Sequence, residues 1–302
     1  MKHIFIINPA AGGGLEIASL EAKISETCEA RSIDYVIHRT EVAGDATAFV
    51  RQFAEENIPA RIYACGGDGT LNEVISGAPT APHLAFGLIP HGTGNDFHRN
   101  FENGDAFFDI DSQLDGEIHP IDIFSCNGNY GINMINIGFD CDVVERTSLL
   151  QKKYPIPRKM AYIAGLVQIF FRRIGVRFRL ELADGEKFDK NMTLSLVANG
   201  SFCGGGFKTA PLASLNDGLL DVCIIDRVSR AKFLSAVGAY KKGEHLDEKH
   251  HFDFISYRQT PSLRIKFPKP QKYCVDGQID LAKELKIEVL PSALRFIYPK
   301  NK

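Results

Sequence analysis

Residues 66–74, GGDGTLNEV, have the types and spacing best suited to chemistry on a phosphate group. Glycines let a backbone come close to a phosphate, because a Cβ atom obstructs either the approach or the backbone conformation that it needs. Asp68 would repel that phosphate unless a divalent cation lies between them, or unless its carboxylate positions an attacking hydroxyl. The alternative is a tight turn with a capping aspartate, and the motif by itself leaves both interpretations open.

Two further glycine-bearing stretches have the same character: residues 89–97, IPHGTGNDF, and residues 7–14, INPAAGGG. Each follows an apolar run, so all three stretches are expected to begin where a strand ends. A helix that follows such a loop offers unpaired N–H groups and a positive dipole end to an anion. The pattern GxxxxGK[ST] does not occur, which excludes a P-loop enzyme. The spacing of the glycines also differs from GxGxxG, which excludes the usual dinucleotide-binding fingerprint.

The elements that must position these loops alternate between strand and helix in the first part of the chain. Strands are predicted at residues 3–7, 35–39, 61–65 and 85–89, and helices at 15–31, 44–57 and 71–76. Such alternation predicts a mostly parallel sheet with helices on both faces. Ligands of these sheets bind beyond the carboxyl ends of the strands, which is where the glycine loops fall.

The pattern changes at about residue 120, where short β-like segments with turn residues become dominant. The segments are residues 120–126, 130–138, 176–182, 192–198, 219–225, 263–267 and 285–289. Hairpin turns are predicted at Asn127-Gly128, Asp184-Gly185 and Asp276-Gly277. Helices are expected near 157–173 and 230–242, within a mainly antiparallel β domain.

Composition narrows the class of protein. A chain of 302 residues with 44% hydrophobic and 24% charged residues fits a globular protein of two domains. The net charge of −2 argues against a protein built to bind nucleic acid. Seven cysteines without a CxxC pair favour reduced thiols in a cytoplasm. The apolar run at 160–171 is shorter than the ~20 residues that a membrane span needs.

The loops NPAAGG, GGDGTLNEV and PHGTGNDF, in this order and spacing, resemble the catalytic domain of diacylglycerol kinases and their bacterial lipid-kinase, sphingosine-kinase and ceramide-kinase relatives. The resemblance continues through NIGFDCDVV, the block from SLVANGSF to DGLLDVCII, and YCVDGQ, and so covers nearly the whole chain.

The resemblance implies a Rossmann-like α/β domain of the NAD kinase and diacylglycerol kinase type, followed by an antiparallel β-sandwich domain. The first is expected at 1–122, with 293–302 returning to it, and the second, for the lipid and catalysis, at 123–292. ATP and Mg²⁺ are the implied cofactors. The residues implied to surround ATP are Asn8, Pro9, Ala10, Ala11, Gly12, Thr40, Gly66, Gly67, Asp68, Gly69, Thr70, Leu71, Asn72, Gly92 and Thr93.

The family's magnesium loop corresponds to Ser214, Asp217 and Leu219, where Asp217 supplies a carboxylate and the other two supply backbone carbonyls. Asp68 and Asp122 are implied to join an aspartate–water–magnesium network. Asp276 lies in the turn assigned to the general base, and we favour it over Asp68 for that role.

One departure from the family concerns the residue after this Asp-Gly turn. The family commonly has glutamate there, and this chain has Gln278, which cannot accept a proton usefully. Activity is in doubt if that carboxylate is the base, whereas the change is tolerable if Asp276 or Asp68 does the work.

We therefore expect a cytoplasmic lipid kinase of phospholipid metabolism that transfers the γ-phosphoryl group of ATP to a lipid hydroxyl. The alternatives are a small-molecule kinase like NAD kinase, and a catalytically silent nucleotide- or lipid-binding homologue, which Gln278 supports. The sequence identifies neither the lipid substrate nor the oligomeric state.

Residues 151–180 contain eight basic residues, no acidic residue and the apolar run MAYIAGLVQIFF. A helix of this kind can lie on an anionic membrane surface, which makes the protein peripheral at the membrane. It can equally be a core helix with solvated basic ends.

Overall fold

The structure is a computed structural model that describes residues 1–11, 17–92, 94–154, 156–171, 175–250 and 252–300. The chain divides into two compact units, unit 1 (Met1–Ile123 with Pro291–Lys302) and unit 2 (Phe124–Leu290). Gly12 and Thr93, both expected at the nucleotide, lie outside the described residues. A mixed α/β first part followed by a β-rich second part was predicted, and this is confirmed.

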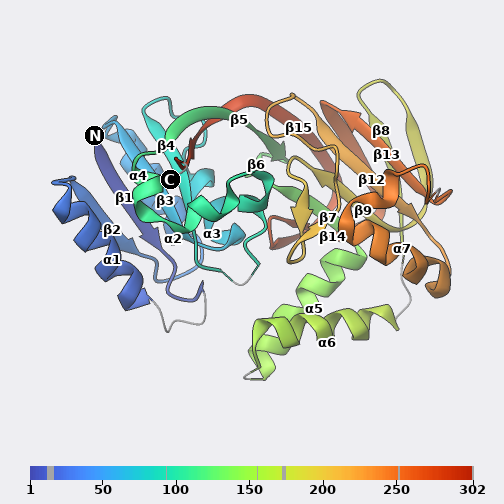
Figure 1. Cartoon of the computed structure of the whole chain (residues 1–302). Helices are drawn as coiled ribbons and strands as arrows, with labels where there is room; N and C mark the ends of the chain where they lie inside the picture. The colour runs from blue at the N-terminus through green and yellow to red at the C-terminus, as the bar shows by residue number, and fades with distance from the viewer. Residues whose placement is uncertain (12–16, 93, 155, 172–174, 251, 301–302) are drawn as a thin grey trace. The chain divides into compact units, whose positions relative to one another are not determined.

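Unit 1 is built on a parallel sheet (Figure 1). Its elements are β1 (Lys2–Ile7), α1 (Ile17–Ala30), β2 (Tyr35–Arg39), α2 (Asp45–Glu55), β3 (Ala60–Gly66), α3 (Asp68–Gly77), β4 (Leu84–Pro90), the 3₁₀ turns η2 (Phe97–Asn100) and η3 (Gly104–Phe108), and α4 (Ile110–Leu114). The strand order is β4-β3-β1-β2, and the end of β15 (Gln278–Tyr298) pairs in parallel with β4 at Phe296 and Phe86. The direction of chain progression reverses between β1 and β3, which is where sheets of this kind bind ligands.

The strands of unit 1 are apolar along their length because both faces of the sheet are covered. Five of the six residues of β1 and all seven of β4 are buried. On one face Phe5, Ile7 and Tyr63 pack against apolar residues of α1 and α4. This buried frame holds the carboxyl ends of β1, β3 and β4 side by side.

The start of α3 differs from the prediction. The helix begins at Asp68, three residues before the predicted start at Leu71, with Gly67 as its N-cap. The Gly67 carbonyl accepts the N–H groups of Thr70 at 3.0 Å and Leu71 at 3.1 Å, which closes the first turn early. Asp68, Gly69 and Thr70 are therefore helical, and Gly69 has no positive φ angle.

Unit 2 is an assembly of antiparallel strands with three helices among its described elements. They are the end of β5 (Glu117–Cys126), β6 (Asn129–Gly131), β7 (Met134–Gly138), α5 (Phe139–Lys153), α6 (Arg158–Phe170), β8 (Val176–Leu182), β9 (Lys187–Ala198), β10 (Phe202–Cys203), β11 (Phe207–Lys208), β12 (Leu220–Asp226), α7 (Arg230–Lys242), the 3₁₀ turn η4 (Glu244–Leu246), β13 (Ile255–Thr260), β14 (Ser262–Val275) and most of β15. The path β13-β12-β9-β7-β14-β15 is joined by β8, which pairs with both β9 and β14.

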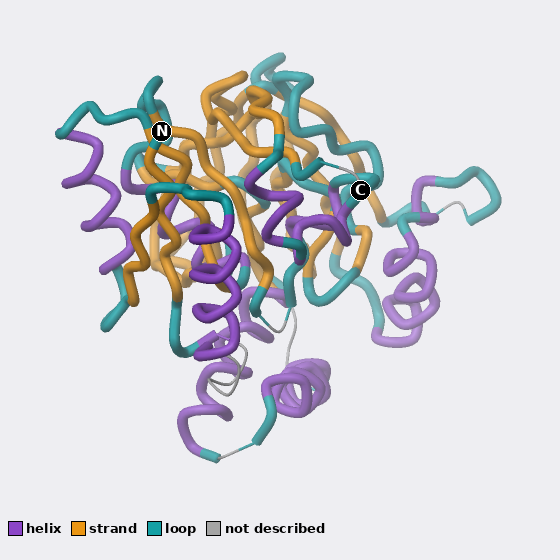
Figure 2. Tube along the Cα trace, turned by 60° about the vertical axis from the view of Figure 1, so that its left-hand side comes forward, coloured by secondary structure: helices purple, strands orange, loops and turns teal. Residues whose placement is uncertain are grey.

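Unit 2 has two apolar cores because residues of β7, β9 and β12 alternate between two faces. Ile135, Val197 and Val222 belong to a core shared with β8, β14 and β15. Met134, Leu196 and Cys223 belong to a second core with α5, α6 and α7. Both views show α5 and α6 as a pair that lies beyond the strands of unit 2 (Figure 1 and Figure 2).

The hairpin predictions are confirmed where both turn residues adopt left-handed angles. Asn127 and Gly128 have φ of 51° and 87° between β5 and β6, and Asp276 and Gly277 have 46° and 93° between β14 and β15. These are the angles of the two-residue turn that suits a hairpin. Gly185 has φ of 89° in the turn between β8 and β9.

Several elements were not predicted or were predicted too short, among them α5, β13 and β15. α5 was missed, although acidic residues in its first turn and lysines in its last turn complement a helix dipole. β13 was missed, and β15 spans 21 residues where only 285–289 were expected. No helix in the described residues has the length and apolar composition that a bilayer crossing requires.

Candidate functional site

The loops after β3 and β4 meet through glycines. A Cβ atom on Gly92 would lie 2.5 Å from the Cα of Gly67, and one on Gly66 would lie 2.3 Å from the Thr70 hydroxyl oxygen. Such contacts are too short for real atoms, so glycine is required at 66 and 92 by close approach. The His91 N–H donates to the Gly66 carbonyl at 2.8 Å, which continues the β3–β4 pairing into the loops.

The loop after β1 is tied to the same place by Asn8. Its Nδ2 donates to the Thr70 hydroxyl at 3.0 Å, and its backbone N–H donates to the Cys65 carbonyl at 3.1 Å. The Asn8 Oδ1 accepts the Ala10 N–H at 3.0 Å, which turns the chain. Thr40 follows β2, and its N–H donates to the Ile7 carbonyl at 2.9 Å. Pro9 and Ala11 lie in the same loop.

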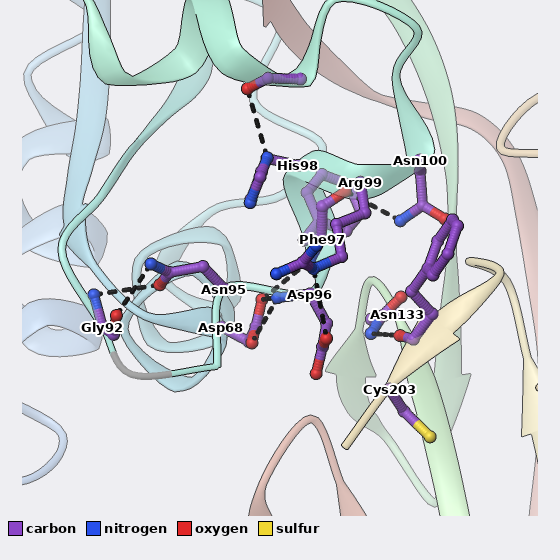
Figure 3. A network of polar contacts seen from close by, with 12 residues as sticks. Asp68, Gly92, Asn95, Asp96, Phe97, His98, Arg99, Asn100, Asn133 and Cys203 are labelled. Carbon is purple, nitrogen blue, oxygen red and sulfur yellow. Dashed lines mark hydrogen bonds and ion pairs between the residues drawn. The ribbon is translucent and has the colours of Figure 1, made fainter. Parts of the chain in front are cut away.

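Asp68 has a clear structural role that the sequence did not reveal (Figure 3). Its carboxylate accepts the N–H of Asp96 at 3.0 Å on both oxygens, and its Oδ1 accepts the N–H of Phe97 at 2.9 Å. The first turn of α3 is therefore fastened to the residues that open η2. A carboxylate has about four acceptor positions, so one bound in this way still has capacity for a cation.

Asn95 shapes the loop after β4. It has φ of 49°, and its side chain returns to Gly92, accepting the Gly92 N–H at 3.0 Å and donating to the Gly92 carbonyl at 2.8 Å (Figure 3). Asparagine tolerates this left-handed conformation better than most residues. Two hydrogen bonds therefore hold Asn95 against Gly92.

The groups that can receive an anion here are backbone N–H groups and one histidine. α3 has ten residues, and the N–H groups of Asp68 and Gly69 precede its first intrahelical bonds. The Nε2 of His91 is buried and has no hydrogen-bond partner among the described residues. These groups are of the kinds that bind a polyphosphate, and the close approach at Gly66 and Gly92 holds their loops together. Leu71 and Asn72 are buried within α3 behind them.

His98, the second histidine beside this loop, is structural. It is buried, one ring nitrogen pairs with the Gly104 carbonyl at 3.2 Å, and the ring packs against Phe108. Burial and the nearby Arg99 lower the pKa of His98, so the ring is neutral at pH 7.

Asp276 anchors a separate polar cluster in unit 2. Its Oδ2 accepts the Ile132 N–H at 2.8 Å and its Oδ1 accepts the Met134 N–H at 2.7 Å, with the Asn133 N–H at 3.2 Å. Asn199 joins them by donating from Nδ2 to the Ile132 carbonyl at 2.7 Å. Blocks from three distant parts of the sequence therefore meet at this turn. Gln278, which opens β15, is exposed beside it.

The residues expected to hold magnesium fall in two places. Ser214, Asp217 and Leu219 lie in the loop before β12, where the Asp217 Oδ1 accepts the Leu219 N–H at 3.0 Å. Asp122 is buried on β5 in unit 1, and its Oδ1 accepts the Ser292 N–H at 2.7 Å. Among the described residues, no three His, Cys, Asp or Glu side chains converge as a metal site. The exposed Asp217 carboxylate and neighbouring carbonyls are ligands that Mg²⁺ accepts, with water completing its shell.

An apolar cavity in unit 2, which the sequence analysis did not identify, completes the candidate features. It has a volume of about 310 Å³ and lies among α5, α6, α7 and the adjoining strands. Its lining residues are scattered from Asn136 to Tyr240, so no contiguous motif marks it in the sequence.

Comparison with known proteins gives a consistent result over both units. Residues 2–126 match the family model described as diacylglycerol kinase catalytic domain, and residues 133–298 match the one described as YegS C-terminal NAD kinase beta sandwich-like domain. A diacylglycerol kinase of Bacillus subtilis (strain 168) is 30% identical over 288 residues, which cover 92% of this chain and 90% of that protein.

A protein of Shewanella frigidimarina named "probable lipid kinase YegS-like" is 27% identical over 270 residues. The match covers 86% of this chain and 82% of that protein. Among solved structures, a putative diacylglycerol kinase from Bacillus anthracis str. Sterne superposes with a TM-score of 0.75 at 23% identity. That alignment covers 98% of this chain and 96% of the other, so the two chains share a fold.

Proposed function

The chain belongs to the diacylglycerol kinase catalytic-domain family, and from this premise we propose that it is an ATP-dependent lipid kinase. It transfers the γ-phosphoryl group to a hydroxyl of a diacylglycerol-like lipid. The observation that carries the proposal is the contact of the loops after β3 and β4 at Gly67 and Gly92, with the β1 loop bound to Thr70.

The three glycine loops bind the polyphosphate of ATP in this proposal. The N–H groups of Asp68 and Gly69 at the start of α3 donate to phosphate oxygens, and the Nε2 of His91 faces the same anion. Mg²⁺ supplies neutralisation of the charge on the phosphates when it is bound. Asp217 with the carbonyls of Ser214 and Leu219 would hold a structural ion, and Asp68 and Asp122 would reach a second one through water.

The reaction exchanges one phosphorus–oxygen bond for another. The bond from the γ-phosphorus to the bridging oxygen breaks, a bond to the lipid oxygen forms, and ADP leaves with the bridging oxygen. The hydroxyl proton passes to a carboxylate, for which Asp276 and Asp68 are the candidates. Both carboxylates are bound by backbone N–H groups, so each is held in position. Phosphoryl transfer depends mostly on positioning and charge neutralisation, which makes a weak base sufficient.

A catalytically silent homologue is the second candidate, and Gln278 is the observation that favours it. Both candidates predict ATP binding, so only turnover separates them. Wild-type protein and the Asp276→Asn variant are incubated with Mg²⁺, γ-labelled ATP and a total lipid extract. Label in the organic phase, reduced in the variant, supports the lipid kinase. ATP binding without lipid labelling supports the silent homologue, and labelled NAD in a parallel incubation would identify a different kinase.

A further inference from the structure

One side chain with a permanent positive charge belongs to the loops of the candidate nucleotide site in unit 1. The three glycine stretches, with the η2 turn that continues the third, cover residues 7–14, 66–74 and 89–100, and Arg99 is their only lysine or arginine. Their two histidines are His91 and His98, of which His98 is neutral because burial and the nearby Arg99 lower its pKa. A polyphosphate carries several negative charges, so a fixed cation among these loops would stabilise a bound nucleotide.

Arg99 is connected to the first turn of α3 through two contacts (Figure 3). Its Nε lies 3.7 Å from the Oδ1 of Asp96. The Asp96 N–H in turn donates to both carboxylate oxygens of Asp68 at 3.0 Å. Asp68 opens α3, where unpaired N–H groups can bind phosphate. The guanidinium therefore belongs to the cluster of contacts that forms the anion-binding end of this helix.

The Arg99 guanidinium has donors to offer to a ligand. At 3.7 Å, its contact with Asp96 is an ion pair that is too long for a good hydrogen bond. The Arg99 side chain is 41% exposed, whereas that of Asp96 is only 7% exposed. An arginine has five N–H donors in a planar fork that matches two oxygens of one phosphate. Arg99 is therefore accessible and suited to a second anion.

The strand order indicates which phosphate lies at Arg99. The loops follow the order β4, β3, β1, β2 along the sheet, so Arg99 and Thr40 are at opposite ends of the row. Glu41 and Asp45 come directly after Thr40, and their negative charges disfavour phosphate at that end. Arg39, the last residue of β2, is already paired with a glutamate of α1. A nucleotide along this edge therefore places its nucleoside beside β2 and its terminal phosphate beside β4.

We propose that Arg99 is a catalytic residue whose guanidinium binds the γ-phosphoryl group of ATP. The inference rests on the proposed function, because it concerns the transfer step of the same kinase. The phosphoryl group passes from the bridging oxygen of ADP to the lipid oxygen, and the hydroxyl proton goes to a carboxylate. Arg99 exchanges no proton, since its guanidinium stays charged throughout. Its contact strengthens as negative charge develops on the phosphoryl and bridging oxygens, which lowers the barrier.

Nucleotide binding tests where the guanidinium lies along the polyphosphate. Titration calorimetry with Mg²⁺ compares ATP and ADP on wild-type protein and on Arg99→Ala. The variant should bind ATP about tenfold more weakly and ADP as well as before, because only ATP has the phosphate that Arg99 contacts. Arg99→Lys keeps the charge but loses the planar fork, and should fall between the two. Equal weakening of both nucleotides, or unchanged ATP binding, overturns the placement.

Arg31→Ala is the matched control for charge and residue type. Arg31 is a 33% exposed arginine of unit 1 that pairs with Asp111 and Asp115, outside the glycine loops. Its loss should change neither affinity, because exposed ion pairs of this kind contribute little to the fold. A selective loss of ATP affinity in Arg31→Ala would show that any arginine of unit 1 has this effect, and would overturn the assignment to Arg99.

Turnover supplies the second test. Arg99→Ala should lower kcat for lipid labelling about 100-fold, as loss of one donor to a transition state does. Added guanidinium, at a concentration too low to unfold the protein, should restore part of this rate. It should restore nothing to Gly92→Val, in which the loops themselves are displaced. A kcat of Arg99→Ala near that of the wild-type protein, or equal responses of the two variants to guanidinium, contradicts the catalytic role.

The binding and turnover measurements distinguish this inference from the proposed function. If wild-type protein labels no lipid, the lipid-kinase proposal fails, whereas a selective loss of ATP affinity in Arg99→Ala still supports the position of the guanidinium. If wild-type protein labels lipid and the variant loses ATP and ADP affinity equally, the kinase proposal stands and the role of Arg99 fails.

Discussion

The polar side chains at the glycine loops of unit 1 and those at the apolar cavity of unit 2 differ in their hydrogen bonding. At the glycine loops of unit 1, Asn8, Asp68 and Asn95 are each bound to neighbouring loop groups. At the cavity of unit 2, Asp140 and the Oδ1 of Asn136 have no partner within the described residues. Loop side chains that are bound to neighbouring groups are held in place, whereas unpaired acceptors in an apolar cavity destabilise the unit that contains them.

The largest expected effect is at the glycine loops of unit 1. Gly92→Val places side-chain atoms where a Cβ already lies 2.5 Å from the Cα of Gly67, so the loops must move apart. Kinase activity should fall by at least about 100-fold, since small displacements of positioning groups are costly to catalysis.

The control for this variant is Gly238→Ala in α7, where an added Cβ meets no atom within 4 Å. It should retain activity and should raise stability slightly, because alanine favours a helix more than glycine. A Gly92→Val variant with near-normal activity would contradict the assignment of the glycine loops as the nucleotide site.

Substitutions of Asp276 test whether the polar cluster around this residue in unit 2 needs a carboxylate. Asp276→Ala leaves the N–H groups of Ile132 and Met134 without an acceptor and places alanine at a φ of 46°, so unfolding should become easier by about 3 kcal/mol. Asp276→Asn tolerates the same angle and keeps one acceptor oxygen, and should cost about 1 kcal/mol. Urea denaturation measures both. Equal losses in the two variants would mean that the carboxylate oxygens are not what holds the turn.

The pH dependence of stability sharpens the contrast at Asp140. Burial raises its pKa from the ordinary 3.8 to about 6, so the native chain binds this proton more tightly than the unfolded chain does. The free energy of unfolding should therefore fall as pH rises from about 4 to about 6, because the charged carboxylate is the form that is costly to bury. Urea denaturation at several pH values in this range measures the change. Asp140→Leu should flatten this part of the profile, and a fall that persists in this variant assigns the titration to another group.

The smallest expected effect concerns Gln278. If positioning and charge neutralisation supply most of the catalysis, Gln278→Glu should change the lipid-kinase rate by less than about threefold. A gain of about 100-fold or more would show that the missing carboxylate is the base and that the natural chain is nearly silent. The exposed position of Gln278 makes a large effect of the substitution on folding unexpected.

The strands and glycine loops of unit 1 could be predicted because their signals are contiguous. An apolar run followed at once by GGDGT fixes a strand end and a loop without reference to the rest of the chain. The turn at Asp276 and Gly277 could be predicted for the same reason, since its two residues are adjacent in the sequence. The start of α3 could not be predicted in this way. It depends on the Gly67 carbonyl accepting two N–H groups, and the glycines of the motif favour a loop rather than a helix.

The anchoring role of Asp68 and the cavity of unit 2 could not be predicted because both depend on distant residues. Asp68 is fastened to N–H groups that lie 28 and 29 positions later in the chain, and N–H groups carry no sequence signal. The cavity is lined by side chains from three helices and several strands. One of these helices, α5, was not predicted from the sequence. Its unpaired acceptors become apparent only when their neighbours are known.

The most direct test of the central claim is the initial rate at which γ-phosphate from ATP appears on lipid, measured on anionic vesicles with wild-type protein and Gly92→Val side by side. The lipid-kinase account predicts steady, Mg²⁺-dependent labelling of a lipid hydroxyl by the wild-type protein and a loss of at least about 100-fold in the variant. Wild-type protein that binds ATP and vesicles but labels no lipid, at any lipid composition tried, would contradict it.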